Sequence, residues 1–349
     1  MYKVIVLATS HRTRGGITSV VKAHELGSQW KEFKCKWIET HIDTGILTAL
    51  YYLLKGYLQF ICLMPTAKII HIHLSEPVSA TRKLLFFFPA YIFRKKIIVH
   101  FHAFSPNSTI NGKMQWMYRY MFCRANKVIV LSESWKQSVS EVFNINNIEV
   151  VYNPCSTVIN NNKYSKEKHI LYAGTVNERK GYADMIRAFA KIAKQHNNWK
   201  MVFAGNGEIE EGKQLAKEMG IEDQCIFLGW VNGEEKNMAF KKASIFCLPS
   251  YAEGFPMAVL DAWSYGLPVI TTPVGGIPDV AINGENMLVF SPGNIEALAE
   301  CMHQMISDIK LREKIIKASK KFAKSTFNMN EINKQIGVLY NKLENEIIS

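Results

Sequence analysis

The chain has 349 residues, of which 48% are hydrophobic and 21% charged, and its formal net charge is +12. This length predicts two domains, each large enough to bury its own core. The seven cysteines are scattered singly without a C-x-x-C pair, which argues against a disulfide framework and favours a reducing compartment. The N-terminal segment MYKVIVLATS lacks the basic start and long apolar core of a signal peptide, so we expect a strand there.

The positive charge is concentrated in the first half of the chain. Residues 1–155 hold 19 Lys and Arg against 8 Asp and Glu, a net charge of +11, whereas residues 156–349 hold 23 against 22. This asymmetry predicts that the first half faces an anionic partner, such as a phospholipid surface, a lipid diphosphate or nucleic acid. The alternative is a basic surface that only keeps the protein in solution.

Short β-branched apolar runs alternate with helical stretches along the whole chain, as in buried parallel sheets. They are 3–9, 68–74, 96–102, 127–132, 148–154, 169–175, 199–205, 225–230, 244–250, 268–273 and 287–292. The pattern predicts an α/β protein with two doubly wound Rossmann-like domains. We expect a first domain over 1–155, a polar linker over 155–168 and a second domain over 156–327.

The first motif in chain order is TRGGITSVVKAH, residues 13–24, in which Gly15 and Gly16 follow a strand and open a helix. Glycines let a backbone approach a phosphate closely, and the helix N-terminus favours negative charge. The motif is not G-x-G-x-x-G, so it does not indicate a dinucleotide site. A Gly-Gly pair in an ordinary turn is the alternative.

Two apolar stretches follow. Residues 46–64 are interrupted by Lys55, Gly56 and Gln59, and residues 83–96 are too short to span a bilayer. Each stretch could equally be a buried helix of the domain or part of a surface that dips into a membrane. In the second case a basic cluster would reach the head groups of anionic lipids. It consists of Arg82, Lys83, Arg94, Lys95 and Lys96.

Histidines alternate on two strands, as His71 and His73 and as His100 and His102. The alternation puts each pair on one face of its strand. A metal site would need further ligands at metal-like spacing, and the chain also lacks a D-x-D motif, so we expect no metal.

Residues 250–268, SYAEGFPMAVLDAWSYGLP, are the most informative segment. Glu253 is followed by Gly254 and by Pro256 at the start of a helix, and Asp261 lies eight positions after Glu253. Backbone N–H groups over 254–257 and the helix dipole form an anion cradle. The two carboxylates suit polyol hydroxyls. This combination indicates a nucleotide-sugar site, whereas a capped helix with two solvated acids is the simpler alternative.

The segment resembles the signature of the family 4 retaining glycosyltransferases of GT-B fold. Pro249, Ser250, Glu253, Gly254 and Phe255 match its Pro-Ser and Glu-Gly-Phe context, and Asp261 replaces the usual second Glu. The resemblance implies two Rossmann-like domains facing across a cleft, with a last helix, about 328–349, packed back on the first. It is specific over 170–300, including 271–290 as a floor under the sugar site.

The resemblance also assigns roles to other positions. It implies Glu253, His102 and Lys180 as catalytic residues. The family has an arginine at the position of Thr175, and Arg179 would supply the missing charge. The remaining donor-binding positions it implies are Gly15, Gly16, Arg179, Gly254, Phe255, Pro256, Met257, Asp261, Trp230 and Val231. Trp230 could equally be a hydrophobic plug.

We therefore expect a retaining, metal-independent glycosyltransferase without cofactor, of the bacterial surface-polysaccharide type (O-antigen, lipopolysaccharide or capsule). Its donor would be a nucleotide diphosphate sugar that carries a hexose or N-acetylhexosamine, and its acceptor a lipid-linked saccharide. It would be cytoplasmic and bound peripherally to the anionic inner face of the plasma membrane, with no nucleic acid as partner. The alternatives are a nucleotide-sugar epimerase, a basic nucleic-acid-binding protein and a catalytically inactive sugar-binding partner.

Overall fold

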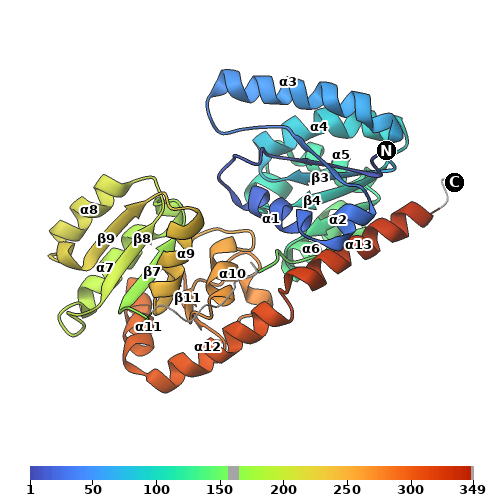
Figure 1. Ribbon diagram of the computed structural model, residues 1–349. Coiled ribbons are helices and arrows are strands. Elements are labelled where there is room, and N and C mark those ends of the chain that lie inside the picture. The colour runs from blue at the N-terminus through green and yellow to red at the C-terminus, as the bar shows by residue number, and fades with distance from the viewer. Residues whose placement is uncertain (156–164, 347–349) are drawn as a thin grey trace. The chain divides into compact units, whose positions relative to one another are not determined.

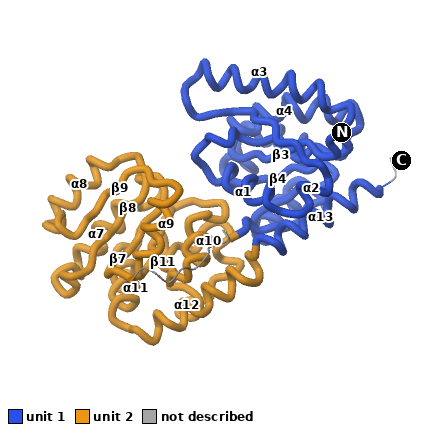
Figure 2. The backbone as a smooth tube through the Cα atoms, viewed as in Figure 1, with its two compact units in different colours: residues 1–154, 329–349 blue, residues 155–328 orange. Residues whose placement is uncertain are grey.

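The computed structural model of the protein describes residues 1–155 and 165–346, which form two compact units (Figures 1 and 2). Unit 1 comprises Met1–Pro154 and Met329–Ser349, and unit 2 comprises Cys155–Asn328. The boundary expected at residue 155 differs by one residue, and most of the expected linker, 156–164, lies outside the described residues. Each unit holds one six-stranded parallel sheet with helical crossovers, which confirms the predicted α/β class.

Unit 1 has the strand order β2-β1-β3-β4-β5-β6, all parallel. Its strands are β1 Val4–Ala8, β2 Lys36–Glu39, β3 Ile69–Leu74, β4 Lys96–Phe101, β5 Lys127–Val130 and β6 Ile148–Val150. Its helices are α1 Gly16–Glu25, α2 Ser28–Glu32, α3 Ile46–Leu63, α4 Pro77–Ile92, α5 Gln115–Arg124 and α6 Glu133–Phe143, with short turns η1 Met64–Thr66 and η2 Pro106–Ile110. The central strands are wholly buried, which explains their continuous apolar runs.

The last helix, α13 (Met329–Asn345), belongs to unit 1 although unit 2 precedes it in the chain (Figure 2). Its buried residues recur at helical spacing, and Ile332, Ile336 and Tyr340 join the core over β1 and β3. Asn333 is buried as well and donates to the carbonyl oxygen of Ala23 in α1 over 3.0 Å. Apolar packing and this polar contact together hold α13 on the sheet.

Helix α3 differs from a buried crossover helix, because only Gly56 and Phe60 of its 18 residues are buried. Residues 46–66 are long and apolar enough to cross a membrane, yet only 11% of the most hydrophobic window is covered by protein. The buried-helix alternative for 46–64 is therefore wrong. The exposed apolar side chains of α3 are Ile46, Leu47, Leu50, Tyr51, Leu54, Leu58 and Ile61.

The basic cluster expected to reach lipid head groups, in and after α4, is also partly wrong. Lys83 is buried and its ammonium group donates to the hydroxyl of Thr40, and burial holds the pKa of Lys83 well below its usual range. Lys95 donates to the carbonyl oxygens of Pro65 and Ala67, each over 2.9 Å. Of the five expected residues, only Arg94 is exposed.

Lys96 pairs with Glu346 over 3.2 Å, and Arg82 is half-buried. Apolar side chains nevertheless lie on the surface of α4. They are Val78, Leu85, Phe88, Tyr91 and Ile92, followed by Phe93.

Unit 2 has the strand order β12-β11-β10-β7-β8-β9, again all parallel. Its strands are β7 His169–Ala173, β8 Lys200–Ala204, β9 Cys225–Gly229, β10 Ile245–Leu248, β11 Val269–Thr271 and β12 Leu288–Val289. Its helices are α7 Tyr182–Ile192, α8 Ile209–Glu218, α9 Gly233–Lys242, α10 Met257–Ser264, α11 Ile295–Ser307 and α12 Ile309–Lys324, with turns η3 Glu178–Lys180, η4 Glu222–Gln224 and η5 Ile277–Asp279. The chain reverses its direction of strand addition between β7 and β10, the position where open α/β sheets bind ligands.

Candidate functional site

Two loops of unit 2 meet at the carboxyl ends of β7 and β10. The first runs from Gly174 to the turn η3, whose first amides are capped by the side chain of Asn177. The second runs from Pro249 to Pro256. The backbone N–H of Tyr251 donates to the carbonyl oxygen of Arg179 over 2.8 Å, which joins the two loops.

Gly181 makes this close approach possible. It has a φ of 72°, and a Cβ at this position would collide with the carbonyl oxygen of Pro249. Any other residue would therefore force the β7 and β10 loops apart. The Lys-Gly pair found in the sequence thus has a structural reason for its glycine.

Glu253 and Lys180 are the central pair of the site. The ammonium group of Lys180 donates to Oε1 of Glu253, and the hydroxyl of Ser250 donates to the same oxygen over 2.7 Å. The side chains of Glu253 and Lys180 are only 8% and 15% exposed. Among the described residues Oε2 of Glu253 accepts no hydrogen bond, so this oxygen is available to a ligand hydroxyl.

Helix α10 begins directly after this pair, with Pro256 as its N-cap. No side chain caps its N-terminus and its first turn holds no acidic residue, so its dipole favours an anion there. Pro256 has no N–H, so the cradle expected over 254–257 consists of the amides of Gly254, Phe255 and Met257. The ring of Phe255 is buried beside Trp263 and Phe327.

Residues 271–290 contact the loop that runs from Pro249 to Pro256. The N–H of Gly276 donates to the carbonyl oxygen of Gly254 over 2.8 Å. Gly275 has a φ of 62°, and a Cβ there would collide with the same oxygen. These contacts agree with the floor that the resemblance implied for this stretch.

Asp261 and Arg179 both have protein partners. Asp261 is buried on α10, and Lys236 of α9 donates to its Oδ2 over 2.5 Å. Arg179 donates through Nη1 to the carbonyl oxygen of Ala252 over 2.6 Å. The guanidinium of Arg179 retains further donors, because one hydrogen bond uses one of its five N–H groups.

Trp230 and Val231 follow β9, at the same edge of the sheet as the two loops. Trp230 is 42% exposed, which is incompatible with a plug buried in unit 2. Gly229 before it has a φ of 68°, so the chain turns sharply at the end of the strand.

In unit 1, Gly15 is the N-cap of α1 and Gly16 its first residue, as the sequence predicted. The first turn of α1 holds no acidic residue, and no side chain caps it. A Cβ on Gly15 would meet no atom within 4 Å, so packing alone does not require glycine there.

His102 follows β4 and is almost fully buried. Its Nε2 lies 2.8 Å from Nδ1 of His73, and the two rings stack at 5.1 Å. Burial, together with the nearby His24, lowers the pKa of His102 to about 3, so its imidazole is neutral at pH 7. His71, His73 and His100 lie close to it, and the pairing of β3 with β4 brings these three buried imidazoles together.

Sequence reasoning missed Ser250 as a partner of Glu253, Lys236 as a partner of Asp261, and His24 as a member of the histidine group. Ser250 could have been found from its spacing of three residues to Glu253. Lys236 and His24 lie on other helices, and the sequence holds no local signal for either contact.

Comparison with known proteins identifies the family of this chain. Residues 157–322 match the family profile described as glycosyl transferases group 1, and residues 8–158 match glycosyltransferase family 4. The chain is 29% identical to an uncharacterised glycosyltransferase of Methanocaldococcus jannaschii, over 68% of this chain and 64% of that protein.

Two relatives have more specific names. A capsular polysaccharide biosynthesis glycosyltransferase of Staphylococcus aureus is 27% identical, over 63% of this chain and 62% of its own length. A lipopolysaccharide 1,6-galactosyltransferase of Salmonella typhimurium is 28% identical, over 64% of each chain. The alignments span less than two thirds of the length of these relatives.

Among solved structures, HepE of Anabaena in complex with UDP superposes with a TM-score of 0.77 at 16% identity, over 97% of this chain and all of that one. This likeness shows the fold. Because the two profiles together span residues 8–322, the chain belongs to the group 1 and family 4 glycosyltransferases, and its two parallel sheets have the GT-B fold.

Proposed function

We propose that this protein transfers a hexose or N-acetylhexosamine from a nucleotide diphosphate sugar to an acceptor, with retention at the anomeric carbon. The observation that carries the proposal is the Glu253–Lys180 pair beside the uncapped N-terminus of α10, at the switch point of the second sheet. The relatives named glycosyltransferases support it, and retention follows from the resemblance to the retaining family.

Each residue of the site has a distinct task in this proposal. Glu253 accepts hydrogen bonds from the sugar hydroxyls through Oε2, while Lys180 and the amides after Gly254 stabilise the negative charge of the leaving diphosphate. The carboxylate of Asp261 binds the ribose, and the ribose competes with Lys236 for this carboxylate. Arg179 adds charge near the diphosphate, where Thr175 lacks it.

Other positions have supporting tasks in the same proposal. Trp230 and Val231 contact the base. In unit 1, Gly15 and Gly16 let the backbone approach a phosphate of a ligand, and His102 is a polar group for an acceptor sugar. No residue has to form a covalent glycosyl intermediate. We propose that the reaction needs no metal ion, because helix-terminal amides and Lys180 supply the positive potential.

We further propose a lipid-linked saccharide acceptor and a peripheral position at the anionic inner face of the plasma membrane. The support is the exposed apolar face of α3, together with the net charge of +11 over residues 1–155. A helix with this face lies in the interface plane, because Lys55 and Gln59 at mid-length disfavour a spanning position. The capsular and lipopolysaccharide relatives agree with such an acceptor.

The test combines ligand binding with product analysis. A panel of UDP- and GDP-sugars is screened for thermal stabilisation, and the best donor, radiolabelled in its sugar, is incubated with a lipid-linked saccharide. We expect stabilisation by one nucleotide class and transfer of label to the lipid fraction. No stabilisation by any nucleotide would overturn the donor site, and isomerised free donor as the sole product would indicate an epimerase.

A further inference from the structure

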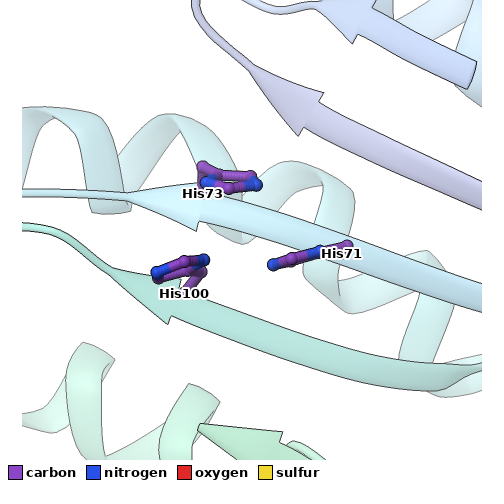
Figure 3. A group of neighbouring side chains, drawn as sticks. All are labelled: His71, His73 and His100. Carbon is purple, nitrogen blue, oxygen red and sulfur yellow. The ribbon is translucent and has the colours of Figure 1, made fainter. Parts of the chain in front are cut away.

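Five buried histidines of unit 1 lie together on one side of β3 and β4. His71 and His73 come from β3, His100 from β4, His102 from the residue after β4, and His24 from α1. The register pairs His73 directly with His100, so the two strands present their imidazoles side by side (Figure 3). All five side chains are less than one tenth exposed.

Three of these histidines bring their ring nitrogens close together. One nitrogen each from His71, His73 and His100 lies within 4.8 Å of the other two. The ring centroids of His71 and His73 are 4.4 Å apart, and those of His73 and His100 are 4.8 Å apart. The ring of His24 lies 6.2 Å from the rings of both His73 and His100.

One nitrogen in each of three rings is already held by the protein. Nδ1 of His71 lies 2.7 Å from the hydroxyl of Tyr340, and Nδ1 of His24 lies 2.8 Å from Oδ1 of Asn333. Nδ1 of His73 contacts Nε2 of His102. Metal-binding histidines are typically oriented in this way, by a hydrogen bond from the nitrogen that does not bind the metal.

The remaining nitrogens of these rings and those of His100 have no such partners. Among the described residues, Nε2 of His24, His71 and His73 and both nitrogens of His100 make no hydrogen bond, although all are buried. A buried polar group without a partner destabilises the folded state, and native interiors rarely leave one in this state. One ligand bound among the four rings would pair four of these five nitrogens.

We propose that His71, His73 and His100 bind a zinc ion, with His24 as the fourth ligand. Imidazole nitrogen is a preferred donor for zinc. A tetrahedral ion with Zn–N bonds of about 2.1 Å draws its donors to about 3.4 Å from one another.

Four protein ligands leave no open position, so this site is structural. It links α1, β3 and β4, and through Tyr340 and Asn333 it also steadies α13. The site lies in unit 1 and does not depend on the proposed donor site of unit 2.

The decisive variant is His100→Leu, because His100 makes no hydrogen bond that the change would break. Without a metal, the substitution removes two unpaired buried nitrogens and should raise the melting temperature. With zinc bound, the substitution removes a ligand and should lower the melting temperature. The two hypotheses therefore predict opposite signs for one measurement.

The full-length protein is prepared without a histidine tag, and its zinc is measured by mass spectrometry before and after dialysis against a chelator. We expect about one zinc per chain in the parent, a higher melting temperature after zinc is returned to the stripped protein, and neither effect in His100→Leu. The control is the double variant His196→Gln, His303→Gln, which removes a histidine pair in unit 2 whose nitrogens lie 2.9 Å apart.

The double variant should still contain about one zinc per chain, and its melting temperature should still rise when zinc is returned. The proposal is overturned if the parent binds no zinc, if His100→Leu melts higher than the zinc-treated parent, or if the control variant alone abolishes the zinc response. Retention of the full zinc response in His100→Leu would overturn it as well.

Discussion

Lys180 and Glu253 are 73 positions apart in the sequence, and in the folded unit the ammonium group of one donates to the carboxylate of the other. The contact joins the loop after β7 to the loop after β10. It also fixes the orientation of Glu253, because Ser250 donates to the same oxygen. The pair therefore positions a carboxylate and a cation at one point of the sheet edge.

The first prediction concerns Glu253→Gln, which keeps the shape of the side chain and removes its charge. We expect turnover to fall about 100-fold or more, because preorganised polar groups of this kind contribute that much in other enzymes. The melting temperature should change little. Initial rates of label transfer provide the measurement, and Glu210→Gln, an exposed acid paired with Lys213, is the matched control. A parental rate in Glu253→Gln would contradict the site assignment.

The second prediction concerns Lys180→Ala. A charge-assisted contact to phosphate contributes roughly 1.5–3 kcal/mol, so we expect the affinity for the nucleoside diphosphate to fall at least tenfold. Calorimetric titration measures it, with Lys213→Ala as the control for a lysine in an exposed pair. Equal affinities in the parent and Lys180→Ala would move the diphosphate to another residue, such as Arg179.

The third prediction concerns metal ions in the transfer reaction. We expect the affinity for the nucleoside diphosphate to be the same in EDTA and in magnesium or manganese, because amides and a lysine provide the charge. Binding is measured within minutes of EDTA addition, so that a buried zinc ion in unit 1 does not exchange. Binding that requires manganese would contradict this mechanism.

The fourth prediction concerns the exposed face of α3. The triple variant Leu50→Asn, Leu54→Asn, Leu58→Asn should lose sedimentation with anionic vesicles, because it removes apolar contacts with the interface. High salt should release the parent protein, since salt screens its basic charge. Val338→Asn, at an exposed apolar position of α13, should bind as the parent does.

Transfer to a soluble acceptor analogue should persist in the α3 variant, because the proposed donor site is in unit 2. Undiminished vesicle binding by the variant would refute α3 as the membrane surface.

The fifth prediction concerns Lys83, whose pKa is lowered by burial and by the nearby Arg82. The unfolded chain binds the proton more tightly than the folded protein. The contribution of Lys83 to stability is therefore present above the unfolded pKa of about 10.4 and is lost as the pH falls from there towards the lower folded pKa.

Lys83→Met should consequently be at least as stable as the parent at pH 7.5, and its stability should rise less between pH 7.5 and 9.5. The difference in slope is at most about 1.4 kcal/mol per pH unit. Urea denaturation at both pH values measures it, with Lys55→Met as the exposed control. Identical slopes in Lys83→Met and the parent would show that Lys83 is charged in the folded protein.

The sequence by itself determined the features that depend on neighbours in the chain. The β-branched runs specify buried parallel strands, because a strand covered on both faces needs no polar alternation. The segment 250–268 carries its carboxylate, glycine and helix start within a few residues. The candidate donor loop and the family could therefore be predicted from the sequence. Gly15 and Gly16 were placed at the start of α1 for the same reason.

Only the tertiary structure decided which side chains are buried and which meet across the sheet. Lys83 and Arg94 look equivalent in the sequence, but the packing of α4 buries one and exposes the other. The apolar composition of α3 suits a core as well as a surface, and coverage by neighbouring elements decides between them. His24, His71, His73 and His100 became one cluster only through the pairing of β3 with β4 and the packing of α1, because contacts between distant segments depend on strand order and register, which local sequence patterns do not specify.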